Sequence, residues 1–252
     1  DALGVNSPPW VTETMTNAVM HAIILANAPL SAPLDELPPH DLLVAANGGA
    51  RHAFRAGMIP DAIIGDMDSL APDEAAGFER AGASLFRYPA DKDETDLELA
   101  LDFAVRQRAT EITLYGLFGG RWDMTFANLL LLPAPKYAGV RLRVVEGDTE
   151  MYILRGGEAL TLPGRPGDTV SVIPLGGDAV GLAYRGLEWP LEDAMLPFGT
   201  PRGVSNRLLA EEAIITLQQG VILCIIAHKC PIYKPSSNVL PPGTPTSVPG
   251  RY

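Results

Sequence analysis

Apolar runs typical of buried strands alternate with helical stretches over residues 21–139, and this alternation constrains the fold more than any other feature of the chain. The clearest helical stretch is Thr95–Arg108, whose apolar residues fall on one face. Strands that alternate with helices in this way predict βαβ units and a mostly parallel sheet, which defines an α/β fold. The expected strands are 21–27, 41–46, 61–65, 84–88 and 111–116, and the expected helices are 50–56, 72–81, 95–108 and a segment after Arg121 through Leu132.

The pattern changes after about Val140, where short strand-like runs are separated by Gly and Pro turns. A spacing near ten residues between such runs is typical of a small antiparallel sandwich or barrel. These runs are 142–146, 151–154, 169–174, 179–184 and 221–226. We therefore expect an α/β domain over 21–139, with its mostly parallel sheet flanked by helices, and a C-terminal antiparallel β-sandwich-like domain over 140–230. Residues 1–20 are expected to form an N-terminal extension, and residues 231–252 a Pro-rich tail.

The formal net charge of -11 argues against a general nucleic-acid-binding protein, because such proteins need basic surface to replace counterions. Cys224 and Cys230 are too few for a disulfide framework or a zinc site, and this cysteine usage fits a reducing cytoplasm. The apolar run Val221–Ala227 is far too short to span a bilayer. We expect a cytoplasmic protein that binds neither nucleic acid nor a membrane.

Two short acidic segments follow predicted strands and carry the strongest chemical signal. Asp66 and Asp68 follow one strand, and Asp93 and Asp96 follow the next, beside Lys92. Each segment alone is also typical of an acidic turn that caps a helix. Ligands bind at the carboxyl ends of strands in such sheets, so the two segments together predict one site. Carboxylates there suit Mg²⁺, which retains waters and phosphate oxygens as further ligands.

Weaker signals surround this predicted site. A Gly-Gly-Arg turn lets backbone amides approach an anion and adds a guanidinium, but a plain tight turn explains it equally well. Trp189 suits stacking on a cationic ring, or the core of a hairpin. A Ser-Asn pair could bind a heterocycle, or cap a turn. The remaining candidates are Asn47 and Gly48, Thr95 as a helix N-cap, Arg121 and Asp123, and Ser205 and Asn206.

In their order along the chain these motifs resemble the thiamin pyrophosphokinase family, from about Ala45 to Ile226. The motifs that carry the resemblance are Gly65-Asp66-x-Asp68-Ser69, Lys92-Asp93-x-Thr95-Asp96, Gly119-Gly120-Arg121-x-Asp123 and Gly203-x-Ser205-Asn206. The resemblance implies an α/β domain followed by a β-sandwich-like domain. It also implies a homodimer that binds thiamine between its subunits.

The resemblance further implies transfer of a pyrophosphoryl group from ATP to the thiamine hydroxyl, which gives thiamine diphosphate and AMP. It implies catalytic and Mg²⁺-binding roles for Asp66, Asp68, Asp93 and Asp96. One of these aspartates is expected to accept the hydroxyl proton, with Asp96 as the first candidate. The implied ATP-binding residues are Asn47, Gly48, Lys92, Thr95, Arg121 and Asp123, and the implied thiamine-binding residues are Trp189, Ser205 and Asn206.

Two positions depart from the family pattern. Asn47 stands where the family usually has Asp, and Met124 stands where it usually has His. Both departures lie beside the predicted pocket, so they bear on rate or substrate choice. Two alternatives therefore stay open: a pyrophosphokinase for another hydroxymethyl heterocycle such as a pterin, and a non-catalytic nucleotide- or thiamine-binding module.

Overall fold

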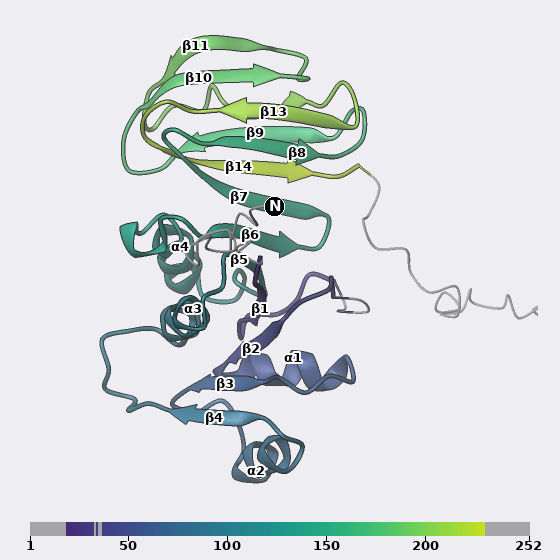
Figure 1. Ribbon diagram of the computed structural model, residues 1–252, viewed down its shortest axis with the longest axis vertical. Helices are drawn as coiled ribbons and strands as arrows, with labels where there is room; N and C mark the ends of the chain where they lie inside the picture. Colours follow the sequence, from purple (N-terminus) through teal and green to yellow (C-terminus); the bar gives the residue numbers. More distant parts are fainter. Residues whose placement is uncertain (1–18, 33, 35–36, 230–252) are drawn as a thin grey trace, which may run out of the picture.

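The computed structural model describes residues 19–32, 34 and 37–229. Almost all of the expected N-terminal extension, the whole Pro-rich tail and Cys230 lie outside these described residues. Within them, ten strands form one large sheet and four form a second (Figure 1). The large sheet has the order β12-β9-β14-β7-β6-β5-β1-β2-β3-β4, and the small one has the order β11-β10-β13-β8.

Six strands of the large sheet run parallel, as the alternation of strands and helices predicts. They are β1 (His21–Leu25), β2 (Leu42–Ala46), β3 (Ala62–Gly65), β4 (Ser84–Arg87), β5 (Glu111–Tyr115) and β6 (Arg141–Glu146). The helices between them are α1 (Ala50–Arg55), α2 (Pro72–Arg80), α3 (Asp96–Arg106) and α4 (Trp122–Leu131), with 3-10 turns at Asn47–Gly49 and Pro135–Tyr137. All five strands and all four helices expected here are present, with ends that differ by a few residues.

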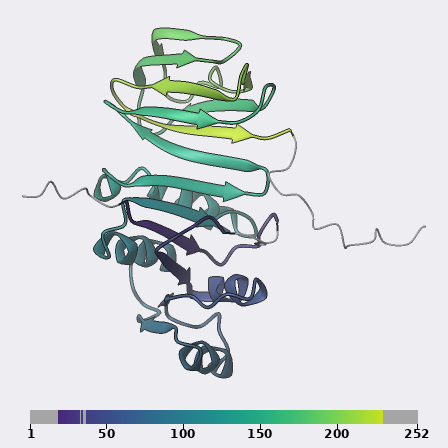
Figure 2. The ribbon, with the colours of Figure 1, turned by 45° about the vertical axis from the view of Figure 1, so that its right-hand side comes forward.

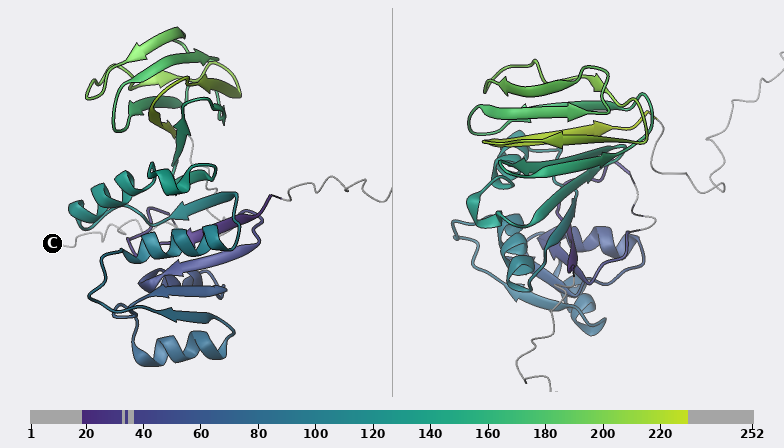
Figure 3. Two further views of the ribbon diagram at one scale, coloured as in Figure 1. Left: turned by 60° about the vertical axis from the view of Figure 1, so that its left-hand side comes forward. Right: turned by 45° about the horizontal axis from the view of Figure 1, so that its top comes forward.

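Helices cover both faces of the parallel strands (Figures 1 and 3). Alternate strand residues point to opposite faces. Ile24 and Val44 pack in the cluster that contains the apolar face of α3, whereas Ile23 and Leu43 pack with Ala53 of α1. The N-terminus of α3 is capped as its sequence predicts, because the Thr95 hydroxyl accepts a hydrogen bond from the Glu98 amide at 3.2 Å. The helix therefore begins at a fixed point beside the strand ends.

The antiparallel part is a sandwich formed by the far end of the large sheet and the small sheet (Figure 2). The large sheet contributes β7 (Thr149–Arg155), β9 (Thr169–Pro174), β12 (Asn206–Arg207) and β14 (Val221–Ala227). The small sheet contains β8 (Ala159–Pro163), β10 (Ala179–Arg185), β11 (Leu191–Leu196) and β13 (Glu212–Thr216). Buried residues from both sheets form one core, and Cys224 lies in it. The predicted fold class is confirmed.

The large sheet is continuous across the predicted domain boundary at position 140. Strand β6 pairs in parallel with β5, and β7 pairs antiparallel with β6, so the backbone ladder passes from one half into the other without a break. The division into residues 21–139 and 140–230 stays a prediction. Within the described residues, no helix has both the length and the apolar content needed to cross a bilayer.

Candidate active site

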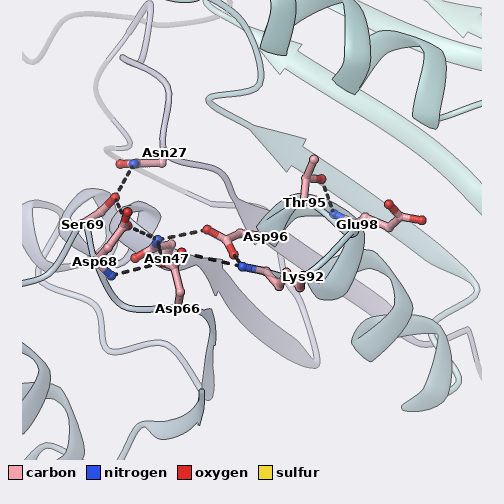
Figure 4. A network of polar contacts seen from close by, with 9 residues as sticks. All are labelled: Asn27, Asn47, Asp66, Asp68, Ser69, Lys92, Thr95, Asp96 and Glu98. Atoms are coloured by element: carbon pink, nitrogen blue, oxygen red, sulfur yellow. Dashed lines mark hydrogen bonds and ion pairs between the residues drawn. The ribbon is translucent and has the colours of Figure 1, made fainter. Parts of the chain in front are cut away.

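The two acidic segments meet at the carboxyl ends of β2 and β3, next to the first turn of α3 (Figure 4). Asp66 and Asp68 follow β3, Asp96 is the first residue of α3, and Asn47 directly follows β2. Side chains from three separate elements therefore converge on one point. We call Asn47, Asp66, Asp68 and Asp96 the carboxylate cluster.

The amide nitrogen of Asn47 lies at the centre of the carboxylate cluster. It donates to Asp66 Oδ1 at 2.8 Å, to Asp68 Oδ1 at 2.9 Å and to Asp96 Oδ2 at 3.0 Å. The Asn47 side chain is buried, and its Oδ1 has no hydrogen-bond partner among the described residues. Hydrogen bonds led by the one from Asn47 hold the pKa of Asp68 below its ordinary value.

The backbone around the carboxylate cluster adopts conformations that few residues accept. Gly65 has a φ of 150°, and a Cβ added there would lie 3.0 Å from Asn47 Cβ and from Asp96 Cγ. Met67 has a φ of 63° and buries its side chain in a core, while Asp66 and Asp68 on either side of it face Asn47. Glycine at position 65 thus allows the strand end and the helix to approach closely.

Lys92 supplies the one cation that contacts the carboxylate cluster in the described part of the chain. Its ammonium lies 3.0 Å from Asp96 Oδ1 and 3.7 Å from Asp66 Oδ2. Burial lowers the pKa of Lys92, but the hydrogen bond and charge of Asp96, with those of Asp66, outweigh burial and raise it above its ordinary value. Three carboxylates against one ammonium leave excess negative charge, which favours a further cation.

Three of the predicted site residues lie outside the carboxylate cluster. Asp93 is exposed and has no hydrogen bond or ion pair with the described side chains. Arg121, which is 73% exposed, donates two hydrogen bonds from its guanidinium to Asp123. This pairing holds the pKa of Asp123 below its ordinary value. The Arg121–Asp123 pair thus lies on the surface and not inside the cluster.

Asn206 fixes the backbone at Trp189. Its Oδ1 accepts from the Trp189 amide at 3.1 Å, and its Nδ2 donates to the Trp189 carbonyl at 2.8 Å. Asn206 is buried, whereas the Trp189 side chain is 54% exposed. Ser205 beside it has a φ of 65° and donates its amide to the Ser171 hydroxyl. The amide of Asn206 therefore presents an exposed indole at the edge of the sandwich.

The carboxylate cluster and the Trp189 segment lie far apart in one chain. Asn206 is on β12, the first strand of the large sheet, and Asp66 follows β3, the ninth. Eight steps between strands of about 4.8 Å each separate the two by roughly 38 Å along the sheet. The two predicted half-sites therefore do not meet within one chain.

Both halves of the chain match models of one family. Residues 35–144 match the thiamin pyrophosphokinase catalytic domain, and residues 159–222 match the thiamin pyrophosphokinase vitamin B1 binding domain. The chain belongs to the thiamin pyrophosphokinase family. Together the two matched segments contain the carboxylate cluster and the Trp189 segment.

Individual thiamine pyrophosphokinases agree with this assignment. The enzyme of Bacillus subtilis (strain 168) is 28% identical over 186 residues, which cover 74% of this chain and 87% of that relative. A crystal structure from the same species has the same fold, with a TM-score of 0.74 at 24% identity over 83% of this chain and 100% of that one. The structure from Geobacillus thermodenitrificans gives a TM-score of 0.71 at 29% identity, and covers 82% of this chain and 97% of that one.

Thiamin pyrophosphokinases use ATP as co-substrate, generally with a divalent metal. The oxygens of Asp66, Asp68 and Asp96 suit such a hard cation in chemical type. Among the described residues, however, no three His, Cys, Asp or Glu side chains are arranged to hold a metal ion by themselves. The amide nitrogen of Asn47 stands between the three carboxylates. The donor set fits a cation once Asn47 is counted as part of it.

Sequence reasoning missed two polar residues at other strand ends. Glu146, the last residue of β6, accepts the Leu117 amide at 2.8 Å and thereby holds the loop that precedes the Gly-Gly-Arg turn. Burial raises the pKa of its carboxyl above the ordinary value. Asn27, just beyond β1, donates to the Ser69 hydroxyl at 3.2 Å. Asn27 and Glu146 are the last residues of the predicted strands 21–27 and 142–146, and a polar residue at that position was the available signal for both.

Proposed function

We propose that this chain is an ATP-dependent thiamine pyrophosphokinase that transfers the pyrophosphoryl group of ATP to the thiamine hydroxyl and releases AMP. The observation that carries the proposal is the convergence of Asp66, Asp68 and Asp96 with Lys92 at the strand ends of the family's catalytic domain. Phosphoryl transfer needs mainly positioning and charge stabilisation, and these residues can supply both.

Within this proposal Asp66, Asp68 and Asp96 hold Mg²⁺, and Asp93 joins them from its exposed turn. The cation would neutralise charge on the phosphates of ATP. Lys92 adds a positive charge at the same place, and Asp96 is the first candidate to accept the proton of the thiamine hydroxyl. Asn47, Gly48 and Thr95 lie around the ATP phosphates, and Arg121 reaches the phosphates from the surface with Asp123 beside it.

We place thiamine between two copies of the chain, with Trp189, Ser205 and Asn206 of one subunit facing the carboxylate cluster of the other. The separation of roughly 38 Å along one sheet supports this arrangement, since a single chain cannot bring the two half-sites together. Helix α4 supports it as well. Trp122, Phe126 and Leu130 recur every fourth residue and are 75%, 59% and 62% exposed, which gives an apolar stripe that a second copy could bury. A cytoplasmic location stays a prediction.

The decisive experiment is an AMP-release assay with purified protein, Mg²⁺, ATP and either thiamine or a hydroxymethylpterin. We expect AMP, not ADP, to appear with thiamine. Release of AMP with the pterin alone would favour the rival pyrophosphokinase. Binding of thiamine and ATP without any turnover would favour a non-catalytic module. ADP as the product would contradict pyrophosphoryl transfer.

Replacement of Trp189 by Ala is expected to raise the thiamine KM about tenfold and to leave the ATP KM within about twofold. The indole would stack on the cationic thiazolium, and a desolvated contact of this kind is worth enough to produce such a change. Steady-state kinetics with each substrate varied in turn measures both constants. Trp189→Phe keeps an aromatic face and should retain most of the affinity. An increase in the ATP KM alone would show that Trp189 is misplaced.

A further inference from the structure

We propose that the side chain of Asn47 is a cation-coupled amide switch. Without a divalent cation its Nδ2 bridges the three carboxylates, and with a cation the amide turns by half a rotation so that Oδ1 becomes a ligand. The proposal rests on the proposed function only in that the cation belongs to the same site. It concerns the metal-free and metal-bound states, and not turnover.

The number of hydrogen atoms on Nδ2 is the first observation. An amide nitrogen carries two hydrogens, but three carboxylate oxygens lie within 3.0 Å of Nδ2. One carboxylate therefore has at best a shared hydrogen. The nitrogen holds the place of a cation, but it cannot satisfy every oxygen around it.

The opposite end of the same amide is the second observation. Asn47 is 3% exposed, and its Oδ1 has no hydrogen-bond partner among the described residues. A buried carbonyl oxygen without a partner is costly. The oxygen of the Asn47 side chain therefore points away from the three carboxylates, where it could coordinate a cation.

The backbone next to Asn47 is closely packed. A Cβ at Gly48 would lie 2.2 Å from Asn27 Oδ1, and one at Gly49 would lie 2.0 Å from the Leu25 carbonyl oxygen, so this turn is pressed against the end of β1. Asn47 itself has a φ of 48°, in the left-handed region that Asn tolerates. Rotation about the last side-chain bond needs no movement of this backbone, and it exchanges Oδ1 and Nδ2.

The distances suit the exchanged position. Neighbouring ligands of an octahedral Mg²⁺, each 2.0–2.1 Å from the ion, are separated by about 2.9 Å. The atom at the present Nδ2 position lies 2.8, 2.9 and 3.0 Å from the three carboxylate oxygens. An oxygen there would be repelled by three carboxylates unless a cation lay among them. Binding of a cation therefore favours the turned amide, and loss of the cation favours the present one.

An aspartate at position 47, the residue typical of the family, could not act in this way. It has no hydrogen to donate, so the metal-free protein would hold four carboxylates together. The cation would then meet a stronger ligand set with no amide to turn. Asn47 thus stabilises the empty site at the expense of cation affinity.

Comparison of Asn47→Asp with the wild-type chain, without nucleotide or thiamine, tests the proposal. In EDTA we expect the variant to unfold at least about 4 °C lower than the wild type. By calorimetric titration we expect the variant to bind Mn²⁺ about tenfold more tightly or better. A variant that folds only with Mn²⁺ gives the same support. The control Gln107→Glu adds an exposed carboxylate at the C-terminal end of α3, roughly 16 Å along the helix from Asp96, and should change Mn²⁺ affinity by less than about threefold.

A measurement on the wild-type chain covers the case in which Asn47→Asp does not fold at all. With ¹⁵N-labelled asparagine, the side-chain NH₂ pair of Asn47 should shift when Mg²⁺ is added, because it leaves the carboxylates. An NH₂ pair that stays unchanged at saturating Mg²⁺ would overturn the proposal. Equal unfolding temperature and equal Mn²⁺ affinity in Asn47→Asp and wild type would overturn it as well. A switch observed in protein that never releases AMP would refute the proposed function and leave the switch standing.

Discussion

The variant Asp66→Asn is expected to lower AMP release by about 10³-fold or more, while the chain keeps its fold. Asp66 contacts both Asn47 and Lys92, so its carboxylate connects the two groups that organise the cluster. An amide in its place removes a charged oxygen ligand, and loss of charge stabilisation in the transition state costs several kcal/mol. Initial rates of AMP formation measure the loss, and circular dichroism with thermal unfolding checks the fold.

Asp73→Asn is the matched control for Asp66→Asn. Asp73 is an exposed residue in the first turn of α2. Its replacement by Asn is the same chemical change as Asp66→Asn, but it lies away from the strand ends. We expect its AMP release to stay within about twofold of wild type. Turnover in Asp66→Asn close to that of the control would refute the metal assignment.

A nearly inactive variant and a variant with weakened thiamine binding should complement each other when they share a dimer. If thiamine lies between subunits, Asp66→Asn inactivates the carboxylate cluster of a site, and Trp189→Ala weakens thiamine binding on the other side of that site. A heterodimer of the two has one site with both defects and one site with neither. One of the two sites in each mixed dimer is intact, so purified mixed dimers should show about half of wild-type activity. Co-expression with two affinity tags, followed by assay at thiamine below the wild-type KM, measures the recovery.

The control for this experiment pairs Asp66→Asn with Asp68→Asn. Both changes lie in the carboxylate cluster, so every site of the mixed dimer contains one of them and no activity should return. If the first pair also stays inactive although the purified protein is a dimer, each site is built within one chain. That result would contradict the shared site and leave the AMP-release assay as the test of function.

The parallel half of the fold and the meeting of the acidic segments were predictable from sequence. Strands buried on both faces read as continuous apolar runs, and the ends of parallel strands must lie at one edge of the sheet. The cap of α3 by Thr95 was equally predictable, because Ser or Thr followed three residues later by Glu is a local signal. The strands and the cap depend on residues close together in the chain, and the meeting of the acidic segments follows from the parallel order of the strands.

The features that the sequence did not predict depend on contacts between distant residues. Strands β8, β11, β12 and β13 were missed. Residues such as Thr161 and Pro163 in β8, and Glu192 and Asp193 in β11, interrupt their apolar runs, and β12 has only two residues. The hydrogen bonds between the Asn206 side-chain amide and the Trp189 backbone join residues that are 17 positions apart in the sequence. The three-way contact of Asn47 spans up to 49 residues, and no local pattern distinguishes it from an ordinary turn.

The unbroken ladder from β12 to β4 connects the Trp189 segment, near one end of the large sheet, with the carboxylate cluster, near the other. Backbone hydrogen bonds between all neighbouring strands oppose a hinge between the two halves, in contrast to enzymes that close two domains over their substrates. If thiamine binds between two copies of the chain, as proposed, water would be excluded by the loops at the strand ends and by the second copy. Dissociation of the dimer, and not bending of one chain, would be the motion that opens the site, so activity should fall on dilution as subunits separate.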